Sequence, residues 1–186
     1  MDTADFLARI RNHYVDQFRV FIEQQRLSCQ QGASELKLQL SEQSDLFDRL
    51  YCVDFIKNDG GRQIYEFQAE NILTFDPIVG TLGKASLSIN HLQWDAVAIH
   101  HDLGGPPPDE LAHWFRFWFD AEDARHDPDA ELSETIHSML IEPNRIDIDF
   151  GTASPDAFWE VLQLLENAGA SRIEVGSSRA EATPSD

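Results

Sequence analysis

Residues 94–127 read WDAVAIHHDLGGPPPDELAHWFRFWFDAEDARHD, and the fold that the sequence predicts is organised around this stretch. Its first part, Trp94 to His101, is typical of a strand. The Gly-Pro run that follows ends the strand, because proline lacks an amide donor and glycine is conformationally loose. The next residues predict an aromatic helix from Pro108 to Asp123, since apolar side chains recur at helical spacing at Leu111, Trp114, Phe115, Trp118 and Phe119.

Upstream, residues 3–31 predict one long amphipathic helix, because Phe6, Ile10, Tyr14, Phe18 and Ile22 recur every four residues. Its four acidic residues balance its four arginines if Asp2 is included. Two interpretations are open for this helix. It covers one face of a sheet, as most amphipathic helices do, or it is a dimerisation helix.

The remaining elements follow from alternation of apolar and polar residues and from turn residues. Asn58-Asp59-Gly60-Gly61 joins two apolar runs and predicts a hairpin, since glycine allows the positive φ of tight turns. Ser154 and Pro155 predict the start of a last helix. Further strands are expected at 35–40, 86–90, 94–101, 137–142, 145–150 and 171–176, and those at 86–90 and 94–101 are expected to be antiparallel neighbours.

The sequence therefore predicts an α+β fold, in which a mainly antiparallel sheet is packed by a long N-terminal helix, an aromatic central helix and a C-terminal helix. We expect a single domain over residues 1–176, with the helix at 1–31 and a sheet-containing body at 32–176. Residues 177–186 are polar and are expected to form a flexible tail.

Charge is the unusual feature of the composition. Asp and Glu number 33 against 14 Lys and Arg, which gives a formal net charge of -19. Such a surface repels phosphate, so we expect no nucleic-acid partner and no membrane partner. The acidity is interpreted either as a means of solubility, or as a surface for a basic protein partner, which includes mimicry of nucleic acid.

The two cysteines, Cys29 and Cys52, lie in no CxxC pattern and are expected to be reduced. No apolar run reaches the length of a membrane span, and the first residues do not have the pattern of a secretory signal. The sequence is therefore expected to belong to a cytoplasmic protein.

Candidate chemistry is concentrated at the end of the strand at 94–101. His100, His101 and Asp102 precede the Gly-Pro turn, and His113 lies on the aromatic helix. Neighbouring strand residues point to opposite faces, so the two histidines cannot easily share one metal ion. No HExxH, HxH or CxxC spacing is present. The four residues are thus candidates for a ligand or metal pocket, but no metal is assigned and no cofactor is expected.

Two other groups are candidates. Asp147 and Asp149 share one strand face and could form a carboxylate pair with Glu66 or Glu174, although the wet face of a half-covered sheet is the commoner explanation. On the aromatic helix, Trp114, Phe117 and Trp118 are interface candidates, because aromatic residues anchor many protein interfaces. The alternative for the two tryptophans is core packing.

No nucleophile elbow, dinucleotide fingerprint or phosphate loop is found, which disfavours those enzyme classes but leaves open whether the protein is an enzyme. We expect a non-enzymatic acidic binding or interaction protein that self-associates as a homodimer. The alternative is a small-ligand-binding protein or metal-dependent enzyme with a pocket near His100, His101, Asp102 and His113.

Overall fold

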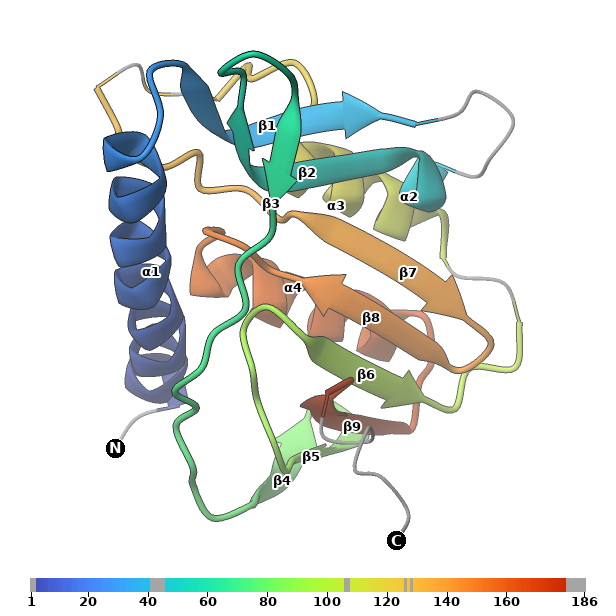
Figure 1. Cartoon of the computed structure of the whole chain (residues 1–186). Helices are drawn as coiled ribbons and strands as arrows, with labels where there is room; N and C mark the ends of the chain where they lie inside the picture. Colours follow the sequence, from blue (N-terminus) through green and yellow to red (C-terminus); the bar gives the residue numbers. More distant parts are fainter. Residues whose placement is uncertain (1–2, 41–45, 106–107, 126, 128, 180–186) are drawn as a thin grey trace, which may run out of the picture.

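The computed structural model describes residues 3–40, 46–105, 108–125, 127 and 129–179 of the chain. Four helices and nine strands form two sheets and the layers that cover them (Figure 1). The α+β class predicted from the sequence is confirmed. Among the described helices, none is both long enough and apolar enough to cross a lipid bilayer.

The smaller sheet has the order β1-β2-β3, with β1 at Gly32–Gln39, β2 at Leu50–Lys57 and β3 at Gln63–Tyr65. Strands β2 and β3 form the predicted hairpin, in which Gly60 has the positive φ of 79°. A four-residue helix, α2 at Leu46–Arg49, leads directly into β2. Helix α1 ends at Leu27, four residues before the end of the helix predicted over residues 3–31, and β1 begins at Gly32.

The larger sheet has the order β4-β5-β9-β6-β8-β7. Its strands are β4 at Ile78–Leu82, β5 at Ala85–Ile89, β6 at Val97–His101, β7 at Ser138–Glu142, β8 at Arg145–Asp149 and β9 at Arg172–Ser177. The predicted pairing of β5 with β6 is wrong, since β9 lies between them, parallel to β5 and antiparallel to β6. Alternation within a strand reveals its buried face but not its neighbours.

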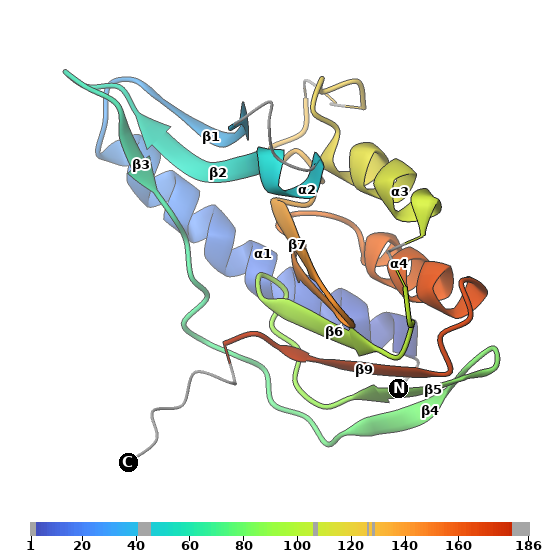
Figure 2. The same cartoon turned by 90° about the vertical axis from the view of Figure 1, so that its right-hand side faces the viewer.

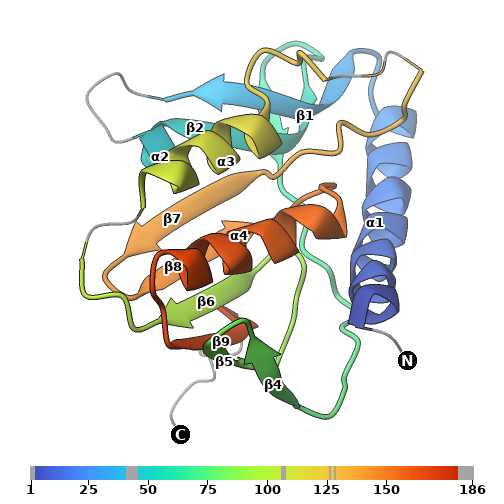
Figure 3. The same cartoon turned by 180° about the vertical axis from the view of Figure 1, so that it is seen from behind.

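Helices α3, at Asp109–Phe119, and α4, at Pro155–Asn167, lie on one face of the larger sheet (Figures 2 and 3). Ser154 caps α4 by accepting from the Asp156 amide, as predicted. Helix α1, at Thr3–Leu27, runs along one side of the molecule, next to the irregular segment 66–77 (Figure 1).

The core lies between α3, α4, α1 and the sheets. At its centre the Trp94 ring lies 4.9 Å from that of Phe150 and 6.3 Å from that of Phe158, centroid to centroid. Arg11 of α1 donates to the carbonyls of Thr152 and Ala153, which joins the helix to the segment between β8 and α4.

The start of the expected tail is ordered. Ser177 ends β9 and donates to Gln93, while the amide of Ser178 donates to the carbonyl of Ala96. Residues 180–186, the rest of the tail predicted to be flexible, lie outside the described residues.

A pair of helix phenylalanines tests this description of the core. Phe158→Ala should lower the free energy of unfolding by about 3–5 kcal/mol, because the ring is fully buried between Trp94 and Phe150. Phe117 is 53% exposed, so Phe117→Ala should lower it by less than about 1 kcal/mol. Urea unfolding measures both, and equal losses would contradict the assigned core.

Candidate functional site

The two sheets meet at a buried histidine. His137, directly before β7, accepts from the Cys52 amide of β2 through its carbonyl and donates its own amide to the Asp149 carbonyl of β8. Its side chain is 1% exposed, with Nε2 3.1 Å from Glu35 Oε1 and Nδ1 2.9 Å from Asp54 Oδ1. We call Glu35, Asp54, His137 and Asp149 the His137 cluster.

Glu35 reaches this cluster because its backbone leaves the regular strand conformation. Its φ is +50° inside β1, a left-handed conformation that costs a non-glycine residue about 1–2 kcal/mol. The strain is offset by hydrogen bonds to its carboxylate. The Ser133 amide and hydroxyl donate at 2.8 and 2.7 Å, and the Thr152 hydroxyl donates at 2.5 Å. Glu35 therefore ties β1 to the segments on both sides of the β7–β8 hairpin.

The charges of the cluster stabilise one another. Burial opposes the charged form of Glu35, but hydrogen bonds from His137, Thr152 and Ser133 outweigh it and lower the pKa to about 2. Burial alone would also lower the pKa of His137, yet contact with Asp54 and Glu35 raises it well above its ordinary value. The cluster thus holds an imidazolium among carboxylates at neutral pH.

Asp149 is the carboxylate of the cluster with the least compensation. Burial and the charges of Asp54 and Asp95 raise its pKa to about 7, against the opposing effect of His137. Glu66 behaves similarly, since burial and Asp54 raise its pKa to about 7. Asp147 and Asp149 were expected to pair with Glu66 or Glu174 if their strands were neighbours, but β8 lies between β6 and β7, whereas Glu174 is on β9 and Glu66 follows β3 of the smaller sheet.

A pocket of about 270 Å³ opens between the two sheets beside this cluster, and we call it the inter-sheet pocket. Phe47, Leu50 and Leu140 contribute to its apolar wall. Its polar lining consists of three carboxylates and three hydroxyls, and none of the described residues that line it is basic: Asp95, Asp147, Asp149, Tyr51, Ser138 and Ser178.

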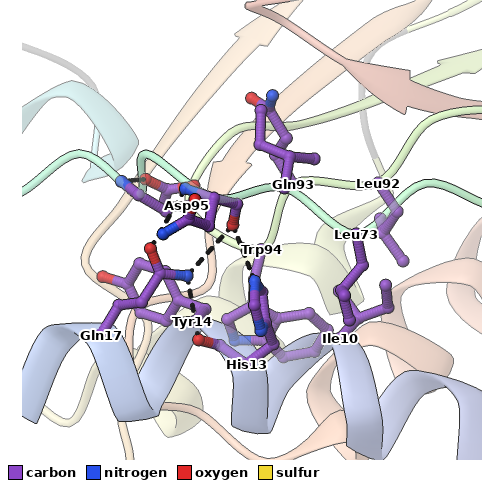
Figure 4. Close-up of a pocket in the computed structure, with 12 residues that line it drawn as sticks. Ile10, His13, Tyr14, Gln17, Leu73, Leu92, Gln93, Trp94 and Asp95 are labelled. Carbon is purple, nitrogen blue, oxygen red and sulfur yellow. Dashed lines mark hydrogen bonds between the residues drawn. The ribbon is translucent and has the colours of Figure 1, made fainter.

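Asp95 is the most buried carboxylate of this pocket. Its side chain is 2% exposed, and its Oδ2 lies 2.7 Å from Nη1 of Arg179. Its Oδ1 has no hydrogen-bond partner among the described residues. Asp95 also lines a second, much smaller cavity of about 20 Å³, together with Tyr14 and Gln17 of α1 (Figure 4).

The arrangement is not that of a nucleophilic enzyme site. Cys52 lies next to the imidazolium, but burial raises the pKa of its thiol to about 12, so the thiol is protonated at neutral pH. His137 itself is enclosed by protein. The polar residues among those that line the inter-sheet pocket carry carboxylates and hydroxyls, which are suited to binding a positive charge or donated hydrogen bonds.

The four ligand or metal candidates occupy different surroundings. His100 faces Arg145 and Glu174 on neighbouring strands, and the Leu103 amide donates to Nδ1 of His101. Asp102 accepts from the amides of Ser171 and Arg172, before and within β9. His113 lines a groove of about 460 Å³ between α3 and α4. Within the described part of the chain, no three His, Cys, Asp or Glu side chains are arranged to hold a metal ion.

The three interface candidates also differ. Trp114 and Trp118 are each 6% exposed, and their indole groups donate to the Ala157 carbonyl and to Glu160 of α4. Both rings therefore pack against α4. Phe117 is exposed, and the Arg125 guanidinium lies 4.4 Å from its ring centroid.

The sequence analysis did not identify Glu35, Asp54, His137 or Asp95. One local signal was present, since Asp54 is the only charged residue inside the apolar run Leu50–Ile56, and an acid within a buried strand needs a partner. Nothing in the sequence pattern indicated which partner it has.

Comparison with known proteins gave no further assignment: no family model matches the chain, and no similar curated protein or solved structure was found.

Gly151 tests the packing around the imidazole. Its φ is +49°, and a Cβ there would lie 2.2 Å from Cδ2 of His137. Gly169 also has a positive φ, of 103°, but a Cβ there would meet open space. Gly151→Ala should therefore destabilise the protein by about 1–3 kcal/mol more than Gly169→Ala. Equal losses in urea unfolding would show that the imidazole is not fixed against Gly151.

The pH dependence of stability tests the charges. Glu35, with its pKa lowered to about 2, stabilises the fold above its ordinary pKa of 4.5, and this contribution is lost as the pH falls toward 2. The loss of stability caused by Glu35→Gln should therefore become smaller as the pH falls over that range.

Asp149, with its pKa raised from 3.8 to about 7, disfavours the fold increasingly as the pH rises between these values. Asp149→Asn should gain stability relative to the unchanged protein over that window and then level off. Thermal melts from pH 3 to 8 measure both, and parallel curves for the two variants would contradict the assignment.

Proposed function

We propose that the protein is a non-enzymatic binding protein for a basic protein partner, and that the inter-sheet pocket receives a cationic side chain of that partner. The observation that carries the proposal is the lining of this pocket. Asp95, Asp147 and Asp149 are among the described residues that line it, and none of those lining residues is basic. Asp147 is paired with Arg145 and Asp95 with Arg179, so Asp149 is the lining carboxylate for which no arginine partner is seen among the described residues.

The other walls favour a cation on an aliphatic stem. Lysine and arginine carry their charge on three or four methylene groups, which pack against apolar surface while the charged end reaches polar groups. Phe47, Leu50 and Leu140 offer such surface next to the carboxylates. The volume of about 270 Å³ is just below the range typical of small-molecule sites and fits one inserted side chain.

Long-range electrostatics also favours a basic partner. The formal net charge of -19 attracts a basic partner and accelerates its encounter, while it repels nucleic acid and anionic membranes. Asp149 adds a local driving force. Its raised pKa reflects burial first and then the charges of Asp54 and Asp95, and a bound cation would partly offset the effect of those charges.

Two further expectations from the sequence belong to this proposal, namely a cytoplasmic location and self-association as a homodimer. Val79 supports the second, because it is 78% exposed on β4, the edge strand of the larger sheet. Exposed apolar residues on an unpaired edge favour association with another chain.

The binding test uses single amino-acid amides as probes. N-acetyl-arginine amide and N-acetyl-lysine amide should bind with a dissociation constant of roughly 1 mM, as expected for a few kcal/mol from one charged pair and its stem. N-acetyl-glutamine amide should not bind measurably. Amide chemical shifts should move at Asp95, Asp147 and Asp149, and Asp149→Asn should weaken binding about tenfold.

Glu122→Gln is the matched control, since Glu122 is exposed in the turn after α3 and the variant loses the same charge. It should bind like the unchanged protein. Equal weakening in both variants would show only a general electrostatic attraction, and the absence of any shift around the pocket would overturn the proposal. Sedimentation velocity on the same samples measures the oligomeric state.

A further inference from the structure

Strand β4 forms one edge of the larger sheet, and among the described strands β5 is its single neighbour. It runs along the lower margin of the molecule in Figure 2. On β5, Ser86 donates its amide to the carbonyl of Ser171, directly before β9, and so points away from β4. Residues opposite one another in an antiparallel pair either bond to each other or both point away. Thr81, opposite Ser86, therefore presents its N–H and C=O to the open edge, and so does Val79 two residues earlier.

The sequence of β4 lacks the features that commonly protect an edge strand, which are charged side chains, proline and bulges. It reads Ile-Val-Gly-Thr-Leu, without a charged residue, in a chain whose formal net charge is -19. Strand β1, an edge of the smaller sheet, differs in this respect, because it carries Lys37 and Glu35, whose φ of +50° departs from strand geometry. The edge at β4 is thus open to an added strand.

Strand β4 is also complementary to a second copy of itself, because its sequence is nearly symmetric about Gly80. When two copies run antiparallel with Gly80 opposite Gly80, Val79 of each copy lies opposite Thr81 of the other. These are the residues with outward-facing backbone groups, so each of the two pairs exchanges both of its N–H···O bonds. On the other face of the sheet, Ile78 lies opposite Leu82. Cross-strand pairs of β-branched and apolar side chains stabilise neighbouring strands.

The charges on either side of β4 agree with the same register. Asp76 lies two residues before the strand and Lys84 two residues after it, and both are exposed. Pairing that is symmetric about Gly80 places Asp76 of one copy opposite Lys84 of the other, at both ends of the paired strands. Within one chain the strand itself separates these two residues by about 13 Å or more, so they are not partners of one another. The edge therefore matches a second copy in charge as well as in shape.

We propose that two copies of the chain form a two-fold dimer in which their β4 strands pair antiparallel, with Gly80 at the symmetry axis, so that the two larger sheets become one. A two-fold interface uses the same surface patch on both subunits, which a nearly symmetric strand satisfies. This inference rests on the self-association that is part of the proposed function, and it is independent of the inter-sheet pocket. It adds the interaction surface and its register.

Sedimentation equilibrium of the full chain, over a series of concentrations, measures the dimer dissociation constant. Val79→Lys should raise this constant at least tenfold, because each copy then places a charge at the strand pair and loses a β-branched contact. Ile64→Lys is the matched control, since Ile64 is 52% exposed on β3, an edge of the smaller sheet, and the variant adds the same charge. It should change the constant less than twofold.

An exchange of charges tests the register. Asp76→Lys and Lys84→Asp should each raise the dissociation constant about threefold, because like charges then lie opposite one another at both ends of the strand pair. The double variant restores opposite charges between the copies with their positions exchanged. Its constant should return to within twofold of that of the unchanged protein.

A cysteine at the symmetry axis provides a direct readout of the pairing. Gly80 would form a pair without mutual hydrogen bonds, in which the Cα atoms lie about 4.5 Å apart and within the range of a disulfide. A Cβ at Gly80 would meet nothing within 4 Å, so the side chain is accommodated. Oxidised glutathione should convert most of Gly80→Cys into a disulfide-linked dimer, whereas Ile64→Cys should stay largely unlinked.

The outcomes separate this inference from the proposed function. A dimer that survives Val79→Lys, or that Ile64→Lys weakens equally, would overturn the β4 interface and leave self-association standing. Linkage of Ile64→Cys without linkage of Gly80→Cys would overturn it as well. A double charge variant as weak as its parents would overturn the register. If the unchanged protein is a monomer at every concentration, self-association itself fails, while binding of the arginine and lysine probes is measured separately. Urea unfolding confirms that each variant is folded.

Discussion

The contact between the imidazole of His137 and the carboxylates of Glu35 and Asp54 is the constraint on which the arrangement of the two sheets depends. Its Nε2 and Nδ1 lie 3.1 and 2.9 Å from oxygens on β1 and β2, while the backbone of His137 bonds to β2 and to β8. Removing one partner from such a buried pair is strongly destabilising, because it leaves an uncompensated charge. The sheets are therefore joined at this point by buried polar groups.

This polar junction also explains the adjacent pocket. An imidazolium can stabilise only so much negative charge, and Glu35 and Asp54 are its closest partners. Asp149, on the pocket side, receives less compensation, as its raised pKa of about 7 reflects. Asp95 completes its own pairing with Arg179 instead. The fold thus concentrates negative charge next to an opening, and the same charges that hold the sheets together bias that opening toward cations.

Local elements were predictable from the sequence, whereas their assembly was not. The hairpin at Asn58–Gly61 and the cap at Ser154 follow from turn and cap chemistry, and both are confirmed. Strand β4 was missed because Gly80 and the nearby Pro77 indicate a break. The position of β9 between β5 and β6 depends on pairing across 72 to 86 residues, about which alternation carries no information. The His137 cluster was missed for the same reason, since Glu35 and His137 are 102 residues apart, although Asp149 was recognised as a candidate.

Strand β9 has a consequence for the order of folding. Among the strands of the described residues, it alone connects the β4–β5 hairpin with β6, β8 and β7 through hydrogen bonds. During synthesis the earlier strands of the larger sheet therefore exist as two separate parts, each with an open edge, until residues 172–177 have emerged. Contacts of such large sequence separation form slowly, and unpaired edges attract other chains in the meantime. The nascent protein passes through a stage in which chaperone binding or misassembly competes with insertion of a single six-residue strand.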